Sequence, residues 1–540
     1  MTIIPRPQSF EIGSGVLKLN REAHITCQGE GALDVGQLLA EYLRPATGFA
    51  FPVAEARETG TIHLEAAEIA RPDEVGFVDE SYSVTVNESG VCLKANNATG
   101  LARAIQCLRQ LFPAAIMADT VQEVEWVLPQ MEIGDTPKFR WRGQHLDVCR
   151  HFFSVEEVCG FIDLLALHRL NICHLHLTDD QGWRIEIKKF PRLTEIGSIR
   201  ESTLIGHESS RPRRYDKTPY GGYYSQEDIG KIVAFAGRRH ITLVPEIDMP
   251  GHMVAAITAY PELGNFRTET RVRCHWGISQ NVLNVDDGTV DFMKDVLDEV
   301  MELFPGRFIH IGGDEAPKFE WSESERAQER MAELGLKSED GLQSWFIKQM
   351  DTHIADAGRL LIGWDEILEG GLAEGAAVMS WRGEKGGIEA AQQGHNVVMA
   401  TCGSLYFDHY QAEPGEAEPL AIGGMTPLES VYAYDPIPEA MPKEKHHHVL
   451  GGQGQLWSEY MATMDQVEYM GFPRICALSE VLWLEAERKD YPNFLKRLKV
   501  HRDRLDMLQV NAHPGHEGKG SYGFSDTNLP AEMDRSKETQ

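Results

Sequence analysis

A short apolar run ends in two adjacent carboxylates at residues 308–315, which read FIHIGGDE. Residues 308–311 are typical of a buried β-strand, and Asp314 and Glu315 follow a pair of glycines. Two neighbouring carboxylates are costly to bury together unless they have a function. The pair therefore indicates a functional site at the end of this strand.

The same pattern recurs along the chain, and longer helical patterns such as residues 155–168 and 342–357 lie between the runs. Alternation of strands and helices predicts βα units. Eight such strands fit one closed (β/α)8 TIM barrel of the α/β class. The predicted strands are residues 144–148, 172–177, 242–247, 308–311, 360–364, 378–381, 397–400 and 452–457.

The chain has 540 residues, more than one ordinary domain requires. Residues 1–135 mix short alternating runs with one apolar-periodic segment at 98–112, which predicts a small α+β domain. Residues 136–510 would form the catalytic barrel, and residues 511–540 a polar C-terminal tail. Long loops are expected near 184–224 and 401–448, where loops at a barrel mouth commonly build a site.

Composition and charge limit the classes of partner that the protein is expected to bind. The 52 basic and 82 acidic residues give a net charge of −30, which repels phosphate backbones and anionic lipid headgroups. We therefore expect no nucleic acid partner. No apolar stretch is long enough to predict a membrane span.

The termini and cysteines suggest a compartment. The first residues lack the basic and apolar regions of a signal peptide, so we expect a cytoplasmic protein, with the periplasm or secretion as the alternative if a leader was removed. The nine cysteines are scattered and form no CxxC pair, which predicts reduced, mostly buried thiols rather than a disulfide framework or a zinc site.

Polar and aromatic residues gather at the carboxyl ends of the predicted strands. In a parallel barrel these ends converge on one face, where such enzymes have their active sites. The set contains several carboxylates, arginines and at least four tryptophans, without a Gly-rich phosphate loop or a serine elbow. Indoles suit the apolar faces of a pyranose, and charged groups suit its hydroxyls, so the sequence predicts a sugar site.

Asp314 and Glu315 indicate the reaction. A carboxyl with a raised pKa can protonate a glycosidic oxygen. In ordinary glycosidases the second carboxylate stands roughly 5 to 9.5 Å across the sugar, which chain neighbours reach less naturally. The economical hypothesis is that the substrate's own 2-acetamido oxygen attacks, while Asp314 orients that amide and Glu315 protonates the leaving group. A solvated acidic turn is the alternative.

These residues carry a resemblance to the family 20 glycoside hydrolases, the exo-acting β-N-acetylhexosaminidases. The HxGGDE string at 310–315, DVxRHF at 147–152 and WDE at 364–366 stand in the family's order, and the resemblance runs from residue 98 to residue 459. It implies retaining, substrate-assisted removal of terminal β-linked N-acetylglucosamine or N-acetylgalactosamine through an oxazolinium intermediate, without a metal or cofactor. It also implies that Glu315 is the general acid and then the base, and that Asp314 holds the acetamido nitrogen.

The other residues that the resemblance assigns to the substrate site are Arg150, Asp179, His252, Trp364, Trp381, Tyr406, Asp408, Trp457 and Glu459. The three tryptophans would wall an acetamido pocket, and Tyr406 would donate to the acetamido oxygen. Arg150 and Glu459 would hold the outer hydroxyls, and Asp408 would reach the 6-hydroxyl. Asp179, or its neighbour Asp180, would form a relay with the histidine behind Glu315.

Two other functions fit part of the pattern. His174 and His176 share one face of a strand, a spacing that metal-dependent barrel hydrolases use, although hydrogen-bonded barrel histidines explain it as well. A non-catalytic sugar-binding protein would keep the aromatic residues but would have no use for a buried carboxyl pair. The aglycone, the preference between the two N-acetylhexosamines and the oligomeric state stay open.

Overall fold

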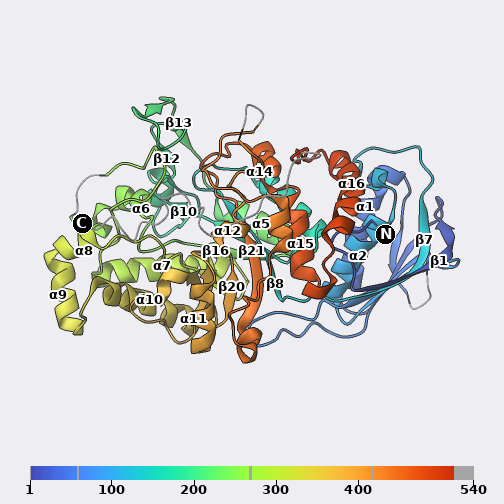
Figure 1. Ribbon diagram of the computed structural model, residues 1–540, viewed down its shortest axis with the longest axis horizontal. Coiled ribbons are helices and arrows are strands. Elements are labelled where there is room, and N and C mark those ends of the chain that lie inside the picture. Colours follow the sequence, from blue (N-terminus) through green and yellow to red (C-terminus); the bar gives the residue numbers. More distant parts are fainter. Residues whose placement is uncertain (1, 57–59, 267–269, 415–417, 516–540) are drawn as a thin grey trace.

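The computed structural model describes residues 2–56, 60–266, 270–414 and 418–515. Figure 1 shows a small N-terminal domain beside a larger barrel. The last strand of the N-terminal sheet ends at Asp135, and the first barrel strand begins at Trp141. Most of the predicted tail, residues 516–540, lies outside the described residues, whereas the backbone of His513 donates to the carbonyl of Phe472 at 3.0 Å.

The N-terminal domain is a sheet with two helices on one face. Its seven strands run in the order β1-β7-β5-β6-β4-β2-β3. The helices α1 (Ala32–Thr47) and α2 (Ala98–Leu111) lie between this sheet and the barrel (Figure 1). The strands are β1 (Ser9–Lys18), β2 (Ile25–Gln28), β3 (Val53–Glu55), β4 (Ile62–Ala66), β5 (Tyr82–Asn87), β6 (Gly90–Ala95) and β7 (Val127–Asp135).

The predicted barrel is confirmed: eight strands close in the order β16-β17-β18-β19-β20-β21-β8-β9, with parallel neighbours. Each predicted strand overlaps an observed one. The strands are β8 (Trp141–Asp147), β9 (Ile172–His176), β16 (Thr242–Glu246), β17 (Phe308–His310), β18 (Leu360–Trp364), β19 (Ala377–Ser380), β20 (Val397–Met399) and β21 (Val449–Gly454).

Helices surround the barrel and bury its outer face (Figure 1). Two of them begin with a capping box, Ser154 with Glu157 and Ser225 with Asp228, which satisfies the first free amides of each helix. The principal helices are α3 (Val155–Leu167), α5 (Gln226–Arg238), α7 (Asp287–Leu303), α10 (Glu339–Asp356), α11 (Lys385–Gln393), α15 (Arg474–Trp483) and α16 (Tyr491–Met507). Among the described residues, no helix combines the length and apolar character of a membrane span.

The two regions predicted as long loops contain short elements of their own. The first holds α4 (Arg192–Glu195) and two antiparallel strand pairs, β12 (Ile199–Arg200) with β15 (Tyr220–Gly221) and, between them in the chain, β13 (Leu204–Ile205) with β14 (Arg214–Tyr215). The second holds α12 (Cys402–Leu405) and α13 (Leu428–Ala433). Smaller helices elsewhere are α6 (Val254–Ala259), α8 (Phe319–Glu323), α9 (Glu325–Leu334) and α14 (Met464–Gly471), and β10 (Thr178–Asp179) pairs with β11 (Gly182–Trp183).

A buried polar joint ties the two domains together. The carboxylate of Asp135 accepts hydrogen bonds from Arg169 Nη1 at 2.6 Å, Trp483 Nε1 at 2.8 Å and Tyr82 OH at 2.5 Å. A buried charge with three donors is well compensated, so the domains form a specific contact. All nine cysteines are free thiols and six are buried, as predicted.

Candidate active site

The predicted site residues all follow the carboxyl ends of barrel strands and meet at one face. Arg150 follows β8, Asp179 lies in β10 just after β9, and His252 follows β16. The carboxyl pair follows β17, and Trp364 ends β18. The remaining residues follow β19, β20 and β21; they are Trp381, Tyr406, Asp408, Trp457 and Glu459.

A tight glycine turn presents the carboxyl pair. Gly312 and Gly313 have φ angles of 63° and 93°. A Cβ atom on Gly312 would stand 1.7 Å from Asp248 Oδ1, so only glycine fits there. Glu315 itself has a φ of 43°, a strained value for a residue with a side chain, and such strain is often found at functional sites.

The two adjacent carboxyls have different environments. The Asp314 side chain is 12% exposed and that of Glu315 is 32% exposed, so only the second is open to a leaving group. Burial, with the charges of Glu315 and Glu246, raises the pKa of Asp314 to about 7, although His252 opposes the shift. The buried atom Asp314 Oδ1 has no hydrogen-bond partner among the described residues, so it can accept from a bound amide.

His252 bridges the pair. Its Nε2 atom lies 3.6 Å from Glu315 Oε2 and 3.8 Å from Asp314 Oδ2, while Nδ1 lies 3.3 Å from Asp179 Oδ1. Burial alone would lower the pKa of His252, but Asp179 and Glu315 raise it well above its ordinary value. These carboxylates therefore favour the protonated form of the ring.

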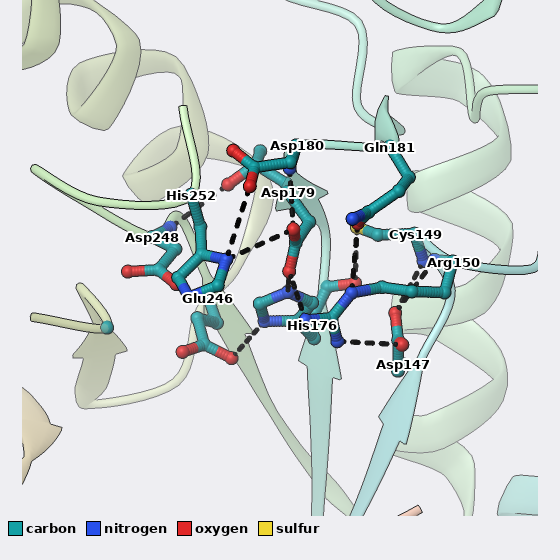
Figure 2. Close-up of polar contacts among 12 residues, drawn as sticks. Asp147, Cys149, Arg150, His176, Asp179, Asp180, Gln181, Glu246, Asp248 and His252 are labelled. Carbon is teal, nitrogen blue, oxygen red and sulfur yellow. Dashed lines mark hydrogen bonds and ion pairs between the residues drawn. The ribbon is translucent and has the colours of Figure 1, made fainter. Parts of the chain in front are cut away.

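Of the two adjacent aspartates, Asp179 makes the closer contact with His252. Figure 2 shows Asp179 between His252, His176 and Arg150. Its Oδ2 atom lies 2.9 Å from Arg150 Nη2 and 2.8 Å from His176 Nε2. Asp180 Oδ2 lies farther from His252 Nδ1, at 3.8 Å, and its carboxylate accepts from the amide of Val254 at 3.1 Å and from Arg273 at 3.0 Å.

Arg150 is fixed from several sides. Its guanidinium donates to Asp147 Oδ2 at 3.1 Å and to Gln181 Oε1 at 3.0 Å, besides its contact with Asp179. It also lies 5.0 Å from the ring centroid of Trp457. A preorganised guanidinium of this kind loses little entropy when it binds a hydroxyl.

Two buried carboxyls beside Arg150 have free oxygens. Asp408 and Glu459 are 5% and 9% exposed, and neither Asp408 Oδ1 nor Glu459 Oε2 has a hydrogen-bond partner in the described parts of the chain. Burial raises the pKa of both, and the charge of Glu459 raises that of Asp408 further. Such oxygens suit the hydroxyls of a bound sugar.

Aromatic side chains complete the site. Trp364 is buried and lies 5.8 Å from Trp457 between ring centroids. Trp381 and Tyr406 stack at 6.1 Å with an interplanar angle of 26°. Burial, with the charges of Cys402 and Asp408, raises the pKa of Tyr406 well above its ordinary value, so its hydroxyl stays a donor.

A cavity of about 260 Å³ opens beside Glu315. Lys318, Gln343, Glu366 and Arg382 contribute to its walls. Because Glu315 is the half-exposed member of the pair, this cavity is where a leaving group would lie. Glu366 also accepts from Trp381 Nε1 at 2.9 Å, a contact that the sequence reading did not include.

The histidines that suggested a metal site are joined to carboxylates instead. Both ring nitrogens of His176 face carboxylates, Glu246 Oε2 at 2.5 Å and Asp179 Oδ2 at 2.8 Å. His174 Nε2 lies 3.1 Å from the same glutamate oxygen, and its Nδ1 atom accepts from Gln453 Nε2 at 2.9 Å. These contacts account for both nitrogens of His176, whereas His174 Nε2 has no hydrogen-bond partner among the described residues. The sequence reading missed Glu246, although it stands at a strand end like the predicted residues.

Comparisons with known proteins agree with this architecture. Residues 139–486 match the catalytic domain of glycosyl hydrolase family 20, and residues 1–136 match domain 2 of the same family. A β-hexosaminidase of Porphyromonas gingivalis is 42% identical over 95% of this chain, which spans 64% of that relative's length.

Solved structures of similar proteins share the whole fold. The β-N-acetylhexosaminidase of Streptomyces coelicolor A3(2) is 32% identical, with a TM-score of 0.81 over 96% of this chain and 98% of the other. A mutant Streptomyces plicatus β-hexosaminidase in complex with the product GlcNAc is also 32% identical, with a TM-score of 0.81 over 95% of this chain and 96% of the other. The chain belongs to glycosyl hydrolase family 20.

Proposed function

We propose that the protein is an exo-acting β-N-acetylhexosaminidase that removes terminal β-linked N-acetylglucosamine or N-acetylgalactosamine with retention of configuration. The observation that carries this proposal is the unequal carboxyl pair: a buried Asp314 with a free oxygen next to a half-exposed Glu315. The partner is an oligosaccharide or small glycoside that ends in such a sugar. No metal or cofactor takes part.

In the first step the substrate's acetamido oxygen attacks the anomeric carbon. The bond to the aglycone breaks, its electron pair goes to the leaving oxygen, and that oxygen takes the proton of Glu315. Asp314 accepts a hydrogen bond from the amide nitrogen and balances the positive charge that develops on the oxazolinium ring. An intramolecular nucleophile held in line is worth about 7 to 11 kcal/mol through its effective concentration.

In the second step Glu315 acts as a base. It takes a proton from water, which attacks the anomeric carbon and opens the oxazolinium ring. Two inversions at one carbon give retention. The aromatic walls of Trp364, Trp381 and Trp457 keep bulk water from the cation until the leaving group has gone.

The exo mode follows from the groups around Arg150. Asp408 and Glu459 offer buried free oxygens to the outer hydroxyls of a terminal sugar, as the resemblance implies. A hydroxyl that donates to one of these buried oxygens is strongly bound, because that oxygen otherwise has no hydrogen-bond partner among the described residues.

Release of a chromogenic aglycone tests the proposal and separates it from a non-catalytic sugar-binding protein. The substrates are aryl β-glycosides of N-acetylglucosamine, N-acetylgalactosamine and glucose. We expect hydrolysis of the first two and little of the third, which has no acetamido group. Binding without hydrolysis would contradict an enzymatic function.

A further inference from the structure

Behind the active site lies a buried carboxylate, Glu246, to which the mechanism above gives no role. It ends β16 and has no exposed surface. Its Oε2 atom lies 2.5 Å from His176 Nδ1, and its Oε1 atom accepts from Trp364 Nε1 at 2.8 Å. Burying a charge costs free energy that its contacts must compensate, so the contacts of Glu246 indicate what it does.

The first contact fixes the state of His176. This ring has carboxylate oxygens on both nitrogens, Glu246 on Nδ1 and Asp179 on Nε2 (Figure 2). Since carboxylates only accept hydrogen bonds, both nitrogens must donate and the ring is an imidazolium. Burial alone would lower the pKa of His176, but Glu246 and Asp179 raise it well above its ordinary value.

Further contacts connect His176 to the general acid, Glu315. Asp179 is shared by His176, Arg150 and His252. His252 Nε2 in turn lies 3.6 Å from Glu315 Oε2. A continuous series of opposite charges therefore joins Glu246 to the proton donor, and each member fixes the orientation of the next.

The second contact of Glu246, with Trp364, lies on the acetamido side of the site. Trp364 would form part of the acetamido wall, and its indole N–H donates to Glu246. A buried indole N–H normally needs an acceptor, and here the same carboxylate that holds His176 provides it. Glu246 thus contacts both the acid series, through His176, and the acetamido wall, through the indole N–H of Trp364.

Other ionisable groups surround Glu246. From the neighbouring strands His174 Nε2 lies 3.1 Å from Oε2, and His310 Nδ1 lies 3.0 Å from Oε1. Burial, with the nearby His174, lowers the pKa of His145 well below its usual value. The charge of Glu246 also contributes to the raised pKa of Asp248 and of Asp314.

We propose that Glu246 is a positioning residue for both halves of the active site. It keeps His176 protonated, so that Asp179 and His252 hold Glu315 in place, and it fixes the indole of Trp364 beside the acetamido group. This inference rests on the proposed function.

The test is Glu246→Gln, which keeps the shape and removes the charge. For a disaccharide with a sugar leaving group, kcat should fall about ten- to 100-fold, and less for an aryl glycoside with an activated leaving group. The affinity for a thiazoline analogue of the oxazolinium ion should fall about tenfold. Trp364→Phe should weaken thiazoline binding without the same leaving-group dependence, because it leaves the acid series intact.

Glu480→Gln is the matched control. Glu480 is equally buried, but it pairs with Arg497 and Tyr432 away from the barrel mouth. We expect the control to change thermal stability without changing the ratio of the two leaving-group rates. Equal losses for both leaving groups in Glu246→Gln, or the same change of ratio in the control, would overturn the proposal.

Nitrogen-15 NMR of histidine-labelled protein gives a readout that does not depend on activity. In the unsubstituted protein the His176 signal, assigned by its loss in His176→Gln, should be that of an imidazolium at pH 8. A neutral ring would overturn the proposal. If this signal is cationic but no glycoside is hydrolysed, the proposed function fails and the charge series stands.

Discussion

The Nε2 atom of His252 lies 3.6 Å from Glu315 Oε2. On its other side the histidine ring meets Asp179 Oδ1 at 3.3 Å, so the cation is held before any substrate arrives. This contact lets Glu315 lose its proton to a leaving group and regain one from water without moving away from its partner.

Glu315→Gln should lose most activity toward poor leaving groups. The variant cannot donate a proton, and general acid catalysis contributes roughly 10²- to 10⁴-fold. Aryl glycosides whose phenols are acidic enough to leave unprotonated should keep much more of their rate. A plot of log kcat against leaving-group pKa measures the effect. Equal losses across the series would contradict the acid role.

Asp314 should control the acid side of the pH profile. Its pKa is raised to about 7 by burial and by neighbouring carboxylates, and its ionised form is the one that balances the oxazolinium charge. As the pH falls below that value the carboxylate is protonated, so kcat/KM should fall. In Asp314→Asn this limb should vanish and kcat should drop about 10²- to 10³-fold. If the limb persists in the variant, another group is responsible for it.

Tyr406→Phe should slow the reaction about ten- to 100-fold, because the acetamido oxygen loses its donor and its alignment. Tyr410→Phe provides the control, since that hydroxyl accepts from the amide of Ala421 in the same loop region. Steady-state kinetics with an aryl glycoside compares the two. A normal rate in the first variant would remove Tyr406 from the site.

Chelation separates this mechanism from a metal-dependent one. Both ring nitrogens of His176 lie within hydrogen-bond distance of carboxylate oxygens, at 2.5 and 2.8 Å, and the proposed mechanism gives no step to an ion. Dialysis against EDTA should therefore leave kcat unchanged. Loss of activity that zinc restores would favour a metal-dependent barrel hydrolase.

The barrel could be predicted because each strand is a short apolar run that ends in polar residues, as at 308–315. The carboxyl ends of parallel strands converge, so Arg150, Trp364 and Glu459 could be brought to one face without a structure. The short strand pairs within residues 199–221 could not be predicted, because two-residue strands are too short to show an alternation of apolar and polar residues. Sequence also could not choose between Asp179 and Asp180, since their ion pairs with Arg150 and Arg273 involve residues far along the chain.

Sequence likewise could not show how the charges are distributed. Burial raises the pKa of Asp314. The sequence could not show which of the two adjacent carboxyls would have the raised pKa. The role of Glu246 depends on contacts with His176 and Trp364 from two other strands. Long-range contacts of this kind become visible only when the barrel has closed.

The most direct measurement compares aryl glycosides whose N-acyl group carries zero to three fluorines. Each fluorine makes the amide oxygen a weaker nucleophile, so log kcat should fall steeply and steadily across the series. A flat series, or an intermediate found covalently bound to a side chain, would show that the protein supplies the nucleophile.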